Sequence, residues 1–302
     1  MVHVGVIILL QALAEVHPVR LQEAQVGSAD SDALQLTDLD ADTFSPAQGR
    51  NGYWSPDEFF AEVGANIYEL EKFDPAKTPI LFVHGAAGTP QDWRYFVAHV
   101  DRDRYQAWFY YYPSGAPVAE AANVLYQRLQ EIQARYRPLR LYITAHSLGG
   151  LVVRDLLARY GDSLPWIKLF VSISTPWGGE HLTEWGTRLS PVVVPAWRDL
   201  RPNGRFLRGL FARALPESLD YYLFFGHRGS RSLLRPNNDG AVTLSSMLRQ
   251  EAQDEADGIY GFDESHVGIL SSQEAVGKYS ALLDMIEEAA NPGTPRKSRV
   301  PL

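Results

Sequence analysis

From Tyr53 onward, short apolar runs alternate with segments whose apolar residues recur at a helical spacing. Continuous apolar runs are typical of strands that are buried on both faces, and amphipathic segments between them are typical of crossover helices. The alternation therefore predicts a mostly parallel sheet that is covered by helices on both faces. The expected strands are 65–70 (antiparallel), 79–83, 105–112, 139–144, 167–173, 221–225 and 258–262, and the expected helices are 91–100, 118–136, 148–160 and 273–289.

A segment of different composition interrupts this alternation at about residues 177–219. It is rich in Trp, Leu, Phe, Pro and Arg, and its apolar residues at 206, 207, 210 and 211 recur at a helical spacing. We interpret this segment as an inserted cap. Its apolar side chains either line a pocket for an acyl chain or form the cap's own core, and the pattern favours neither. The side chains concerned are Trp177, Trp185, Trp197, Phe206, Leu207, Leu210 and Phe211.

Ser147 stands where a strand-like run ends and the helical pattern of residues 148–160 begins. A serine on such a strand-to-helix turn is a nucleophile elbow, because the strained turn exposes its hydroxyl. The positions two before and two after this serine must be small, and Ala145 and Gly149 meet that requirement. A helix-capping serine in an ordinary turn gives the same short motif, so the prediction depends on the flanking strand and helix.

A serine hydroxyl needs a base to accept its proton, and the chain has eight histidines. His266 lies between the last strand and the last helix, at the carboxyl edge of the sheet where Ser147 also lies, so we predict it as the base. A solvent-exposed loop histidine is the alternative. His146 precedes the serine and is expected to point away from the site. The others lie in the leader, in a turn, at a helix end or beside the insertion: His3, His17, His84, His99, His181 and His227.

The base needs a carboxylate to orient it, and this acid is expected between the serine and the histidine in chain order. Asp239 lies in the loop of residues 237–240, after the penultimate strand, where Asn and Gly allow a tight turn. A simple Asx turn is the alternative. Asp220 lies at the wrong end of its strand, and Asp263 and Glu264 are too close to the histidine in sequence.

Hydrolysis at this serine also requires two N–H donors for the developing oxyanion. Leu148 follows the nucleophile and supplies one, and the loop after the first parallel strand supplies the other, for which we predict Ala86. Gly85 and Gly88 in this loop let the main chain approach a substrate carbonyl. The residues predicted to contact substrate are His84, Gly85, Trp177, Phe206 and Leu210.

Together these residues resemble the lipase and esterase branch of the α/β-hydrolase superfamily. The segments that carry the resemblance are Phe82-Val83-His84-Gly85, Ala145-His146-Ser147-Leu148-Gly149-Gly150, Ser174-Thr175-Pro176-Trp177-Gly178-Gly179, Asn238-Asp239-Gly240 and Ser265-His266-Val267-Gly268-Ile269-Leu270. The Thr-Pro loop is also similar to that of hydrolases that deacylate the inositol of glycolipid anchors. The resemblance spans about residues 79–286. It implies an α/β-hydrolase fold with a mostly parallel central sheet, helices on both faces and a cap or lid insertion.

These observations predict a serine carboxylic-ester hydrolase that acts on a small-molecule ester or a lipid through a covalent acyl-enzyme. An acyltransferase, a thioesterase, or a phospholipid or glycolipid deacylase could use the same triad. A non-catalytic binding protein of this fold is disfavoured, because every triad candidate is present. If the cap is a lid, we expect transient contact with a lipid interface. The chemistry needs no cofactor and no metal, and a solvated face is expected for Asp254, Glu255, Asp257, Asp263 and Glu264.

Composition and charge narrow the class of protein further. The chain has 302 residues, of which 45% are hydrophobic, enough to build a sizeable core in one or two domains. Its formal net charge is −8, and no basic stripe is apparent, which argues against nucleic acid as a partner. The absence of cysteine excludes disulfides, thiolate metal sites and a cysteine nucleophile.

The first fifty residues have a different character from the rest of the chain. Residues 4–13 form an apolar run that is too short to span a bilayer, and Ala12-Leu13-Ala14 is similar to a signal cleavage site, although a positive n-region is lacking. We expect an export signal followed by a polar tether over residues 1–50, and hence a periplasmic or secreted protein. A buried strand or helix in a cytoplasmic protein is the alternative. Residues 51–290 form the expected catalytic domain, and residues 291–302 a disordered tail.

Overall fold

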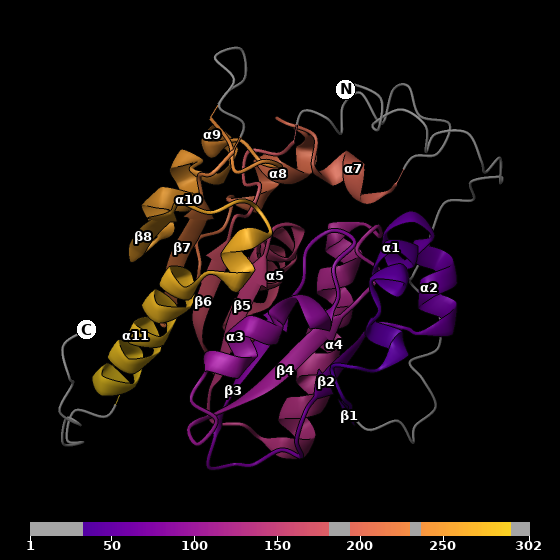
Figure 1. The fold of residues 1–302 in the computed structure, drawn as a ribbon, viewed down its shortest axis with the longest axis vertical. Helices are drawn as coiled ribbons and strands as arrows, with labels where there is room; N and C mark the ends of the chain where they lie inside the picture. The colour runs from indigo at the N-terminus through magenta and orange to yellow at the C-terminus, as the bar shows by residue number, and fades with distance from the viewer. Residues whose placement is uncertain (1–32, 181–193, 230–236, 291–302) are drawn as a thin grey trace.

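The computed structural model describes residues 33–180, 194–229 and 237–290 (Figure 1). Its strands are β1 (Leu34–Leu36), β2 (Asn66–Glu69), β3 (Thr78–Val83), β4 (Tyr105–Tyr111), β5 (Leu141–His146), β6 (Ile167–Ile173), β7 (Asp220–Gly226) and β8 (Gly258–Phe262). They form one eight-stranded sheet in the order β1-β2-β4-β3-β5-β6-β7-β8. Only the pairing of β2 with β4 is antiparallel, so the sheet is mostly parallel, as the pattern predicts.

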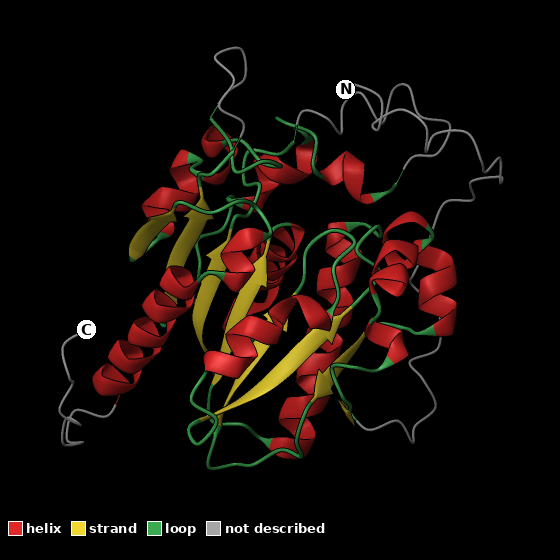
Figure 2. Ribbon diagram, in the orientation of Figure 1, coloured by secondary structure: helices red, strands yellow, loops and turns green. Residues whose placement is uncertain are grey.

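Helices cover both faces of this sheet (Figure 2). They are α1 (Pro46–Trp54), α2 (Pro56–Glu62), α3 (Arg94–His99), α4 (Val118–Tyr136), α5 (Leu148–Tyr160), α7 (Ala196–Asp199), α8 (Arg205–Leu210), α9 (Leu244–Met247), α10 (Gln250–Glu255) and α11 (Gln273–Ala290), with short 3-10 turns at Asp42–Phe44, Pro90–Trp93, Gly161–Ser163 and Gly268–Ser271. Helices α4, α5 and α8 contribute to the apolar core on one face, and α3 and α11 to the core on the other.

Helix α4 illustrates how the sequence sets these elements. Its buried side chains include Leu125, Leu129 and Ile132, whose spacing of four and three residues places them on one face. The helix ends where Arg137 adopts a left-handed backbone conformation with φ of 50°. Pro138 follows and cannot continue the helix, so α4 ends where the sequence predicts.

Residues 33–50 belong to the folded domain, which corrects the prediction of a tether up to residue 50. Strand β1 pairs with β2, and α1 follows it. The buried ring of Phe44 makes edge contacts with Tyr68 and Tyr111. The buried residues Leu34, Leu39 and Phe44 recur every fifth position, a spacing that fits neither a strand nor a helix. The sequence pattern therefore hid this segment.

The cap is described in part. Helices α7 and α8 lie within the insertion, and α8 confirms the helical spacing around residue 206, whereas residues 181–193 with Trp185 lie outside the described residues. The expected export signal and C-terminal tail also lie outside them. Among the residues that the structure describes, no helix combines the length and the apolar character that crossing a bilayer requires.

Candidate active site

Ser147 lies at the sharp turn between β5 and α5. Its backbone has φ of 53° and ψ of −126°, a strained conformation for a residue with a side chain, and its N–H donates a hydrogen bond to the carbonyl of Ile173 at 2.8 Å. The small residues beside it are a steric requirement. A Cβ at Gly149 would come within 2.6 Å of the carbonyl oxygen of His84, and one at Gly85 within 2.8 Å of the Ser147 Cβ.

Two hydrogen bonds link this serine to a histidine and a carboxylate from distant parts of the chain. His266 lies in the loop after β8, and its Nε2 is 2.9 Å from the Ser147 Oγ. Its Nδ1 is 2.6 Å from Oδ2 of Asp239. The backbone N–H of His266 also donates to the carbonyl of Asp239 at 2.8 Å, so the two loops are joined at the main chain as well. The structure thus brings together the three side chains that the sequence singled out.

The environment of Asp239 keeps this carboxyl ionised. The side chain is fully buried, and its Oδ1 accepts hydrogen bonds from the backbone N–H groups of Ala241 at 3.0 Å and Val242 at 2.8 Å. Burial alone would raise the pKa of Asp239, but the hydrogen bond and charge of His266 and these backbone donors outweigh burial and lower the pKa. A buried carboxylate that is ionised and fixed in this way can orient an imidazole and stabilise its protonated form.

The loop after β3 passes directly beside the serine. It forms a turn in which Gly88 N–H donates to the carbonyl of Gly85 at 3.2 Å, and Ala87 has a positive φ of 54°. The Ala87 N–H is occupied, because it donates to the Oγ of Ser114 at 2.9 Å. Within the described parts of the chain, the N–H groups of Ala86 and Leu148 have no hydrogen-bond acceptor. Both predicted oxyanion donors are therefore free to bind a ligand oxygen.

His84 lies beneath this loop and does not line a substrate site, which corrects the prediction of substrate contact. Only 2% of the residue is exposed. Its Nδ1 lies 2.8 Å from the carbonyl of Gly85, its Nε2 accepts from the Tyr112 N–H at 3.4 Å, and its ring stacks on that of Tyr112. Burial lowers the pKa of His84 to about 4, so the ring is neutral at physiological pH. Position in the chain had placed this residue correctly at the sheet edge, but could not reveal its burial.

Two of the predicted cap contacts are also core residues. Trp177 is 1% exposed and packs its ring against those of Phe211 and Tyr221, and Leu210 is 2% exposed in the same apolar core. Phe206 is partly exposed and lines a cavity of about 1000 Å³ between the cap and helices α4 and α5. Leu210 lines the same cavity, but of these three predicted cap contacts only Phe206 is more than marginally exposed.

His146 and Ser114 support the site. The prediction that His146 points away from the site is wrong, and Ser114 was not predicted from the sequence. The Nε2 of His146 lies 2.8 Å from the backbone carbonyl of His266, so its ring points toward the loop that carries the candidate base. Burial lowers the pKa of His146 to about 3. Ser114 follows β4 at the same carboxyl edge as the other site residues. That position is the one sequence feature that could have indicated it.

Helix α1 braces the loop that carries Ala86. A Cβ at Gly49 of α1 would come within 2.6 Å of the Ala87 carbonyl oxygen, so only glycine allows this approach. The N–H of Gly115 donates to the carbonyl of Gly52 at 3.0 Å, which ties α1 to the segment after β4 as well. The segment expected to be a tether is therefore part of the structure around the site.

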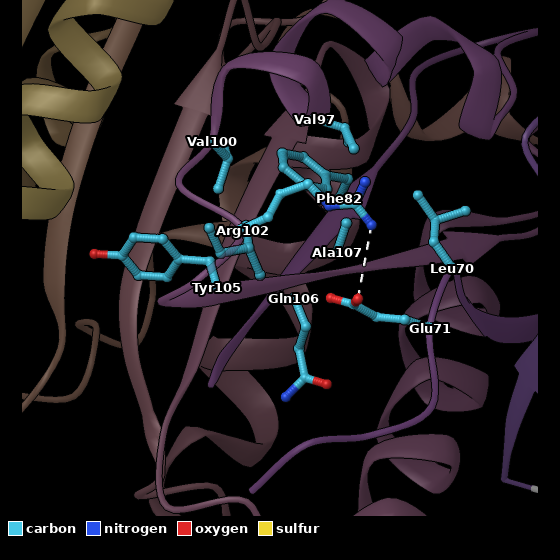
Figure 3. A pocket seen from close by; sticks show the side chains of 10 residues that line it. Leu70, Glu71, Phe82, Val97, Val100, Arg102, Tyr105, Gln106 and Ala107 are labelled. Carbon is cyan, nitrogen blue, oxygen red and sulfur yellow. Dashed lines mark ion pairs between the residues drawn. The ribbon is translucent and has the colours of Figure 1, made fainter. Parts of the chain in front are cut away.

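A second cavity lies away from the serine and is too small for a substrate. It has a volume of about 10 Å³, room for about one water molecule, and lies beside β3 and β4. Figure 3 shows Arg102 and Glu71 beside it, with a nitrogen–oxygen distance of 3.7 Å. In the residues that the structure describes, no three His, Asp or Glu side chains are grouped as a metal site would require.

Comparison with known proteins agrees with this architecture. The chain has the α/β-hydrolase fold: the strand order, the antiparallel β2 and the strand–serine–helix turn are all present. No protein-family model matches the sequence, and a search of curated proteins finds no match either.

Among solved structures, the chain is similar to the mature lipase BlEst2 of Bacillus licheniformis, with a TM-score of 0.56 and 17% identity over 74% of this chain and 97% of that one. It is also similar to a metagenomic carboxyl esterase, with a TM-score of 0.51 and 17% identity over 72% of this chain and 77% of the other. Est1E of Butyrivibrio proteoclasticus has a TM-score of 0.50 and 14% identity over 75% of this chain and 94% of its own. At identities this low, the structural similarity establishes a shared fold and no more.

Proposed function

We propose that the protein is a serine carboxylic-ester hydrolase of the lipase and esterase kind. The observation that carries the proposal is the continuous chain of hydrogen bonds from Ser147 through His266 to Asp239, at 2.9 and 2.6 Å. The hydroxyl stands on a strained turn beside two N–H groups that are free to bind an oxyanion. This arrangement fits acyl transfer, and the similar solved structures include a lipase and a carboxyl esterase.

In the proposed mechanism, the Oγ of Ser147 attacks the ester carbonyl while the Nε2 of His266 accepts its proton. Asp239 holds the Nδ1–H of the imidazole and stabilises the imidazolium. The N–H groups of Ala86 and Leu148 donate to the tetrahedral oxyanion. His266 then gives the proton to the leaving alcohol, and an acyl-enzyme remains on Ser147. Water then attacks the carbonyl of the acyl-enzyme while His266 accepts its proton. This step releases the carboxylic acid and restores the serine.

The proposed substrates are small-molecule esters or lipids. An acyltransferase, a thioesterase or a phospholipid or glycolipid deacylase would use the same residues, and product analysis with alcohol, thioester and phospholipid substrates separates these activities. We also propose contact with a lipid interface through the cap. A rise in rate above the critical micelle concentration of an ester substrate is expected, and a flat rate across it would contradict a lid.

A fluorophosphonate probe tests the nucleophile in one step, because it reacts covalently with an activated serine. We expect labelling of the protein, no labelling of Ser147→Ala, and a loss of roughly 10⁶-fold in kcat for that variant. Ser163→Ala, which changes an exposed serine beyond α5, is the matched control and keeps both properties. Near-normal ester hydrolysis by folded Ser147→Ala, or labelling at another serine, would overturn the proposal.

Export to the periplasm or the medium is part of the proposal. It is supported by the apolar run of residues 4–13 and the small residues that follow it. N-terminal sequencing of the protein recovered from each cell fraction tests it. Recovery of the protein in the cytosol with Met1 in place would refute export.

A further inference from the structure

The described part of the cap carries a concentration of positive charge that contrasts with the rest of the protein. Between Ala196 and Arg213 the acidic side chain is Asp199 alone, whereas the chain as a whole has a net charge of −8. The exposed arginines of this segment, which we call the arginine face, are Arg198, Arg201, Arg205, Arg208 and Arg213. The sequence-based view that the chain has no basic stripe is therefore wrong here, because the overall charge conceals the local one.

The arginine face surrounds a concave surface. A cavity of about 1000 Å³ separates α7 and α8 from α4 and α5, and four members of the face line it together with Arg159. Two carboxylates also line it, and both are engaged. Asp155 accepts a hydrogen bond from Arg159 at 2.5 Å, and Asp199 accepts one from the N–H of Val118 at 2.9 Å. Positive charge therefore exceeds negative charge around the cavity.

The arginines of this face differ from other arginines of the surface in their partners. Arg94, Arg104 and Arg228 each form an ion pair with an aspartate. Within the described ranges, no arginine of this face forms an ion pair. The nearest approach to one is the electrostatic interaction of Arg198 with Asp199. Like charges gathered without partners repel one another, so the arrangement is suited to a ligand that carries negative charge.

Exposed aromatic surface adjoins the arginine face. Trp197 precedes Arg198 on α7, and its Nε1 donates to the hydroxyl of Tyr53 at 2.7 Å. Its ring meets the edge of Trp54, which is 49% exposed. Tryptophan combined with cationic side chains is typical of surfaces that insert at the level of lipid headgroups.

The position of this surface relates it to the candidate active site. Helices α7 and α8 lie at one end of the molecule, beyond the carboxyl ends of the parallel strands (Figure 1). Ser147 follows β5 at that same end. A flat charged layer held against the arginine face would therefore lie on the side from which a substrate reaches the serine.

We propose that the arginine face docks the protein on the phosphate groups of an anionic lipid bilayer. Guanidinium groups pair with phosphate oxygens through two parallel hydrogen bonds. Each cation close to an anionic leaflet strengthens partition about fivefold. The choice of a lipid surface over other phosphate carriers rests on the proposed ester hydrolysis and on the neighbouring tryptophans.

Co-sedimentation with vesicles tests the docking. The protein carries Ser147→Ala, so that no lipid is hydrolysed during the measurement. We expect binding to vesicles of phosphatidylcholine mixed with phosphatidylglycerol, little binding to phosphatidylcholine alone, and release by high salt. When Arg201→Gln and Arg205→Gln are added to Ser147→Ala, partition of the protein onto the anionic vesicles should weaken about twentyfold or more. The matched control is Arg102→Gln with Arg135→Gln, which removes the same charge at the opposite end of the sheet and keeps binding.

Three outcomes overturn the proposal. The first is equal binding to neutral and anionic vesicles, and the second is an equal loss of binding in the control pair. The third is binding to inorganic phosphate or duplex DNA but not to anionic vesicles. Thermal unfolding of each variant shows that it is folded. Because the protein used with the vesicles carries Ser147→Ala, the outcome of the vesicle experiment is independent of the fluorophosphonate experiment. Failure of docking and failure of the proposed hydrolysis are therefore distinguished.

Discussion

The imidazole of His146 donates a hydrogen bond of 2.8 Å from its Nε2 to the backbone carbonyl of His266. The residue before the candidate nucleophile thus holds the loop that carries the candidate base. The two rings are 4.8 Å apart between centroids, and burial keeps the pKa of His146 at about 3, so its ring stays neutral. The two residues are 120 positions apart in the chain, so this bond fixes the end of β5 and a distant loop relative to each other.

Replacing His146 by Leu removes the bond while keeping a buried side chain of similar size. The loop of His266 is then free to shift, and misplacement of a catalytic group by about 1 Å can cost about 10²-fold in rate. We expect kcat for an ester to fall by about that factor. His146→Gln, whose amide can donate to the same carbonyl, should retain more activity than His146→Leu. Equal kcat in folded His146→Leu and the unchanged protein would refute this role.

Asp239→Asn tests the carboxylate. The amide is close in shape but cannot hold the imidazole in the tautomer that accepts the serine proton, and the corresponding change in serine proteases lowers kcat by about 10⁴-fold. We expect a similar loss here, together with slow fluorophosphonate labelling. Asp263→Asn changes an exposed carboxylate close to the same histidine and should leave both rates unaltered. Unimpaired turnover by Asp239→Asn would remove Asp239 from the mechanism.

Ser114→Ala tests the support of the loop that carries Ala86. It removes the acceptor for the Ala87 N–H, and this donor loses the bond that fixes the turn. The expected loss in kcat is smaller than the roughly 10²–10³-fold that follows the removal of an oxyanion donor itself. Steady-state kinetics measure the loss, and the unfolding temperature separates it from a general loss of stability. An unchanged kcat would show that the turn holds its shape without this bond.

Acid should destabilise the fold through two buried histidines. Burial lowers the pKa of His84 to about 4 and that of His146 to about 3, from an ordinary value of 6.5. Below that ordinary value the unfolded chain binds protons that the folded chain does not. The free energy of unfolding should therefore fall as the pH drops from about 6.5 toward 4, by up to about 1.4 kcal/mol per pH unit for each histidine.

Denaturant titrations at several pH values measure this slope. In His146→Gln, whose side chain does not titrate in this range, the free energy of unfolding should depend less steeply on pH. The lowered pKa of Asp239 acts in the same direction at lower pH, because stabilisation by its ionised form is lost as that carboxylate becomes protonated. A free energy of unfolding that stays constant between pH 7 and pH 5 would contradict the prediction.

Arg154 of α5 forms a buried ion pair with Glu255 of α10 and also contacts the cap, where it donates to the carbonyl of Arg213 at 2.6 Å. Arg154 has 1% of its side chain exposed and forms two hydrogen bonds to Glu255, at 2.7 and 3.0 Å. Its guanidinium also lies over the ring of Phe211, 5.1 Å from the centroid. Glu255→Ala would leave a buried charge unpaired, which costs about 3–5 kcal/mol.

Chemical denaturation should show that loss in Glu255→Ala. The double variant Arg154→Met with Glu255→Leu buries no charge and should lose less stability than the single one. If the single variant proved as stable as the unchanged protein, the pair would not stabilise the fold.

Much of the fold could be predicted because the apolar periodicity is strong where elements are buried. The bounds of α4, α5, β6 and β8 are those that the pattern predicts. The meeting of Ser147, His266 and Asp239 follows from a topological fact: all three lie at the carboxyl edge of the parallel strands. Position along the chain was therefore enough to group them.

Other features depend on how deeply a side chain is buried and on local charge, and the pattern of apolar residues along the chain indicates neither. His84 and Trp177 lie in segments next to the site, yet both side chains are turned into the core. The arginine face escaped notice because acidic residues elsewhere dominate the total charge. The folded segment before residue 51 was not predicted because its buried residues follow neither a helical nor a strand period.

The close approach of Gly49 to the carbonyl of Ala87 has a practical consequence. A chain shortened to begin at residue 51 would keep the serine, the imidazole and the carboxylate, but would lose the helix turn that backs the Ala86 loop. Such a protein should still react with a fluorophosphonate, because that probe brings its own strong electrophile. It should turn over ordinary esters poorly. Reactivity with the probe alone would then overstate how much of the proposed activity survives trimming.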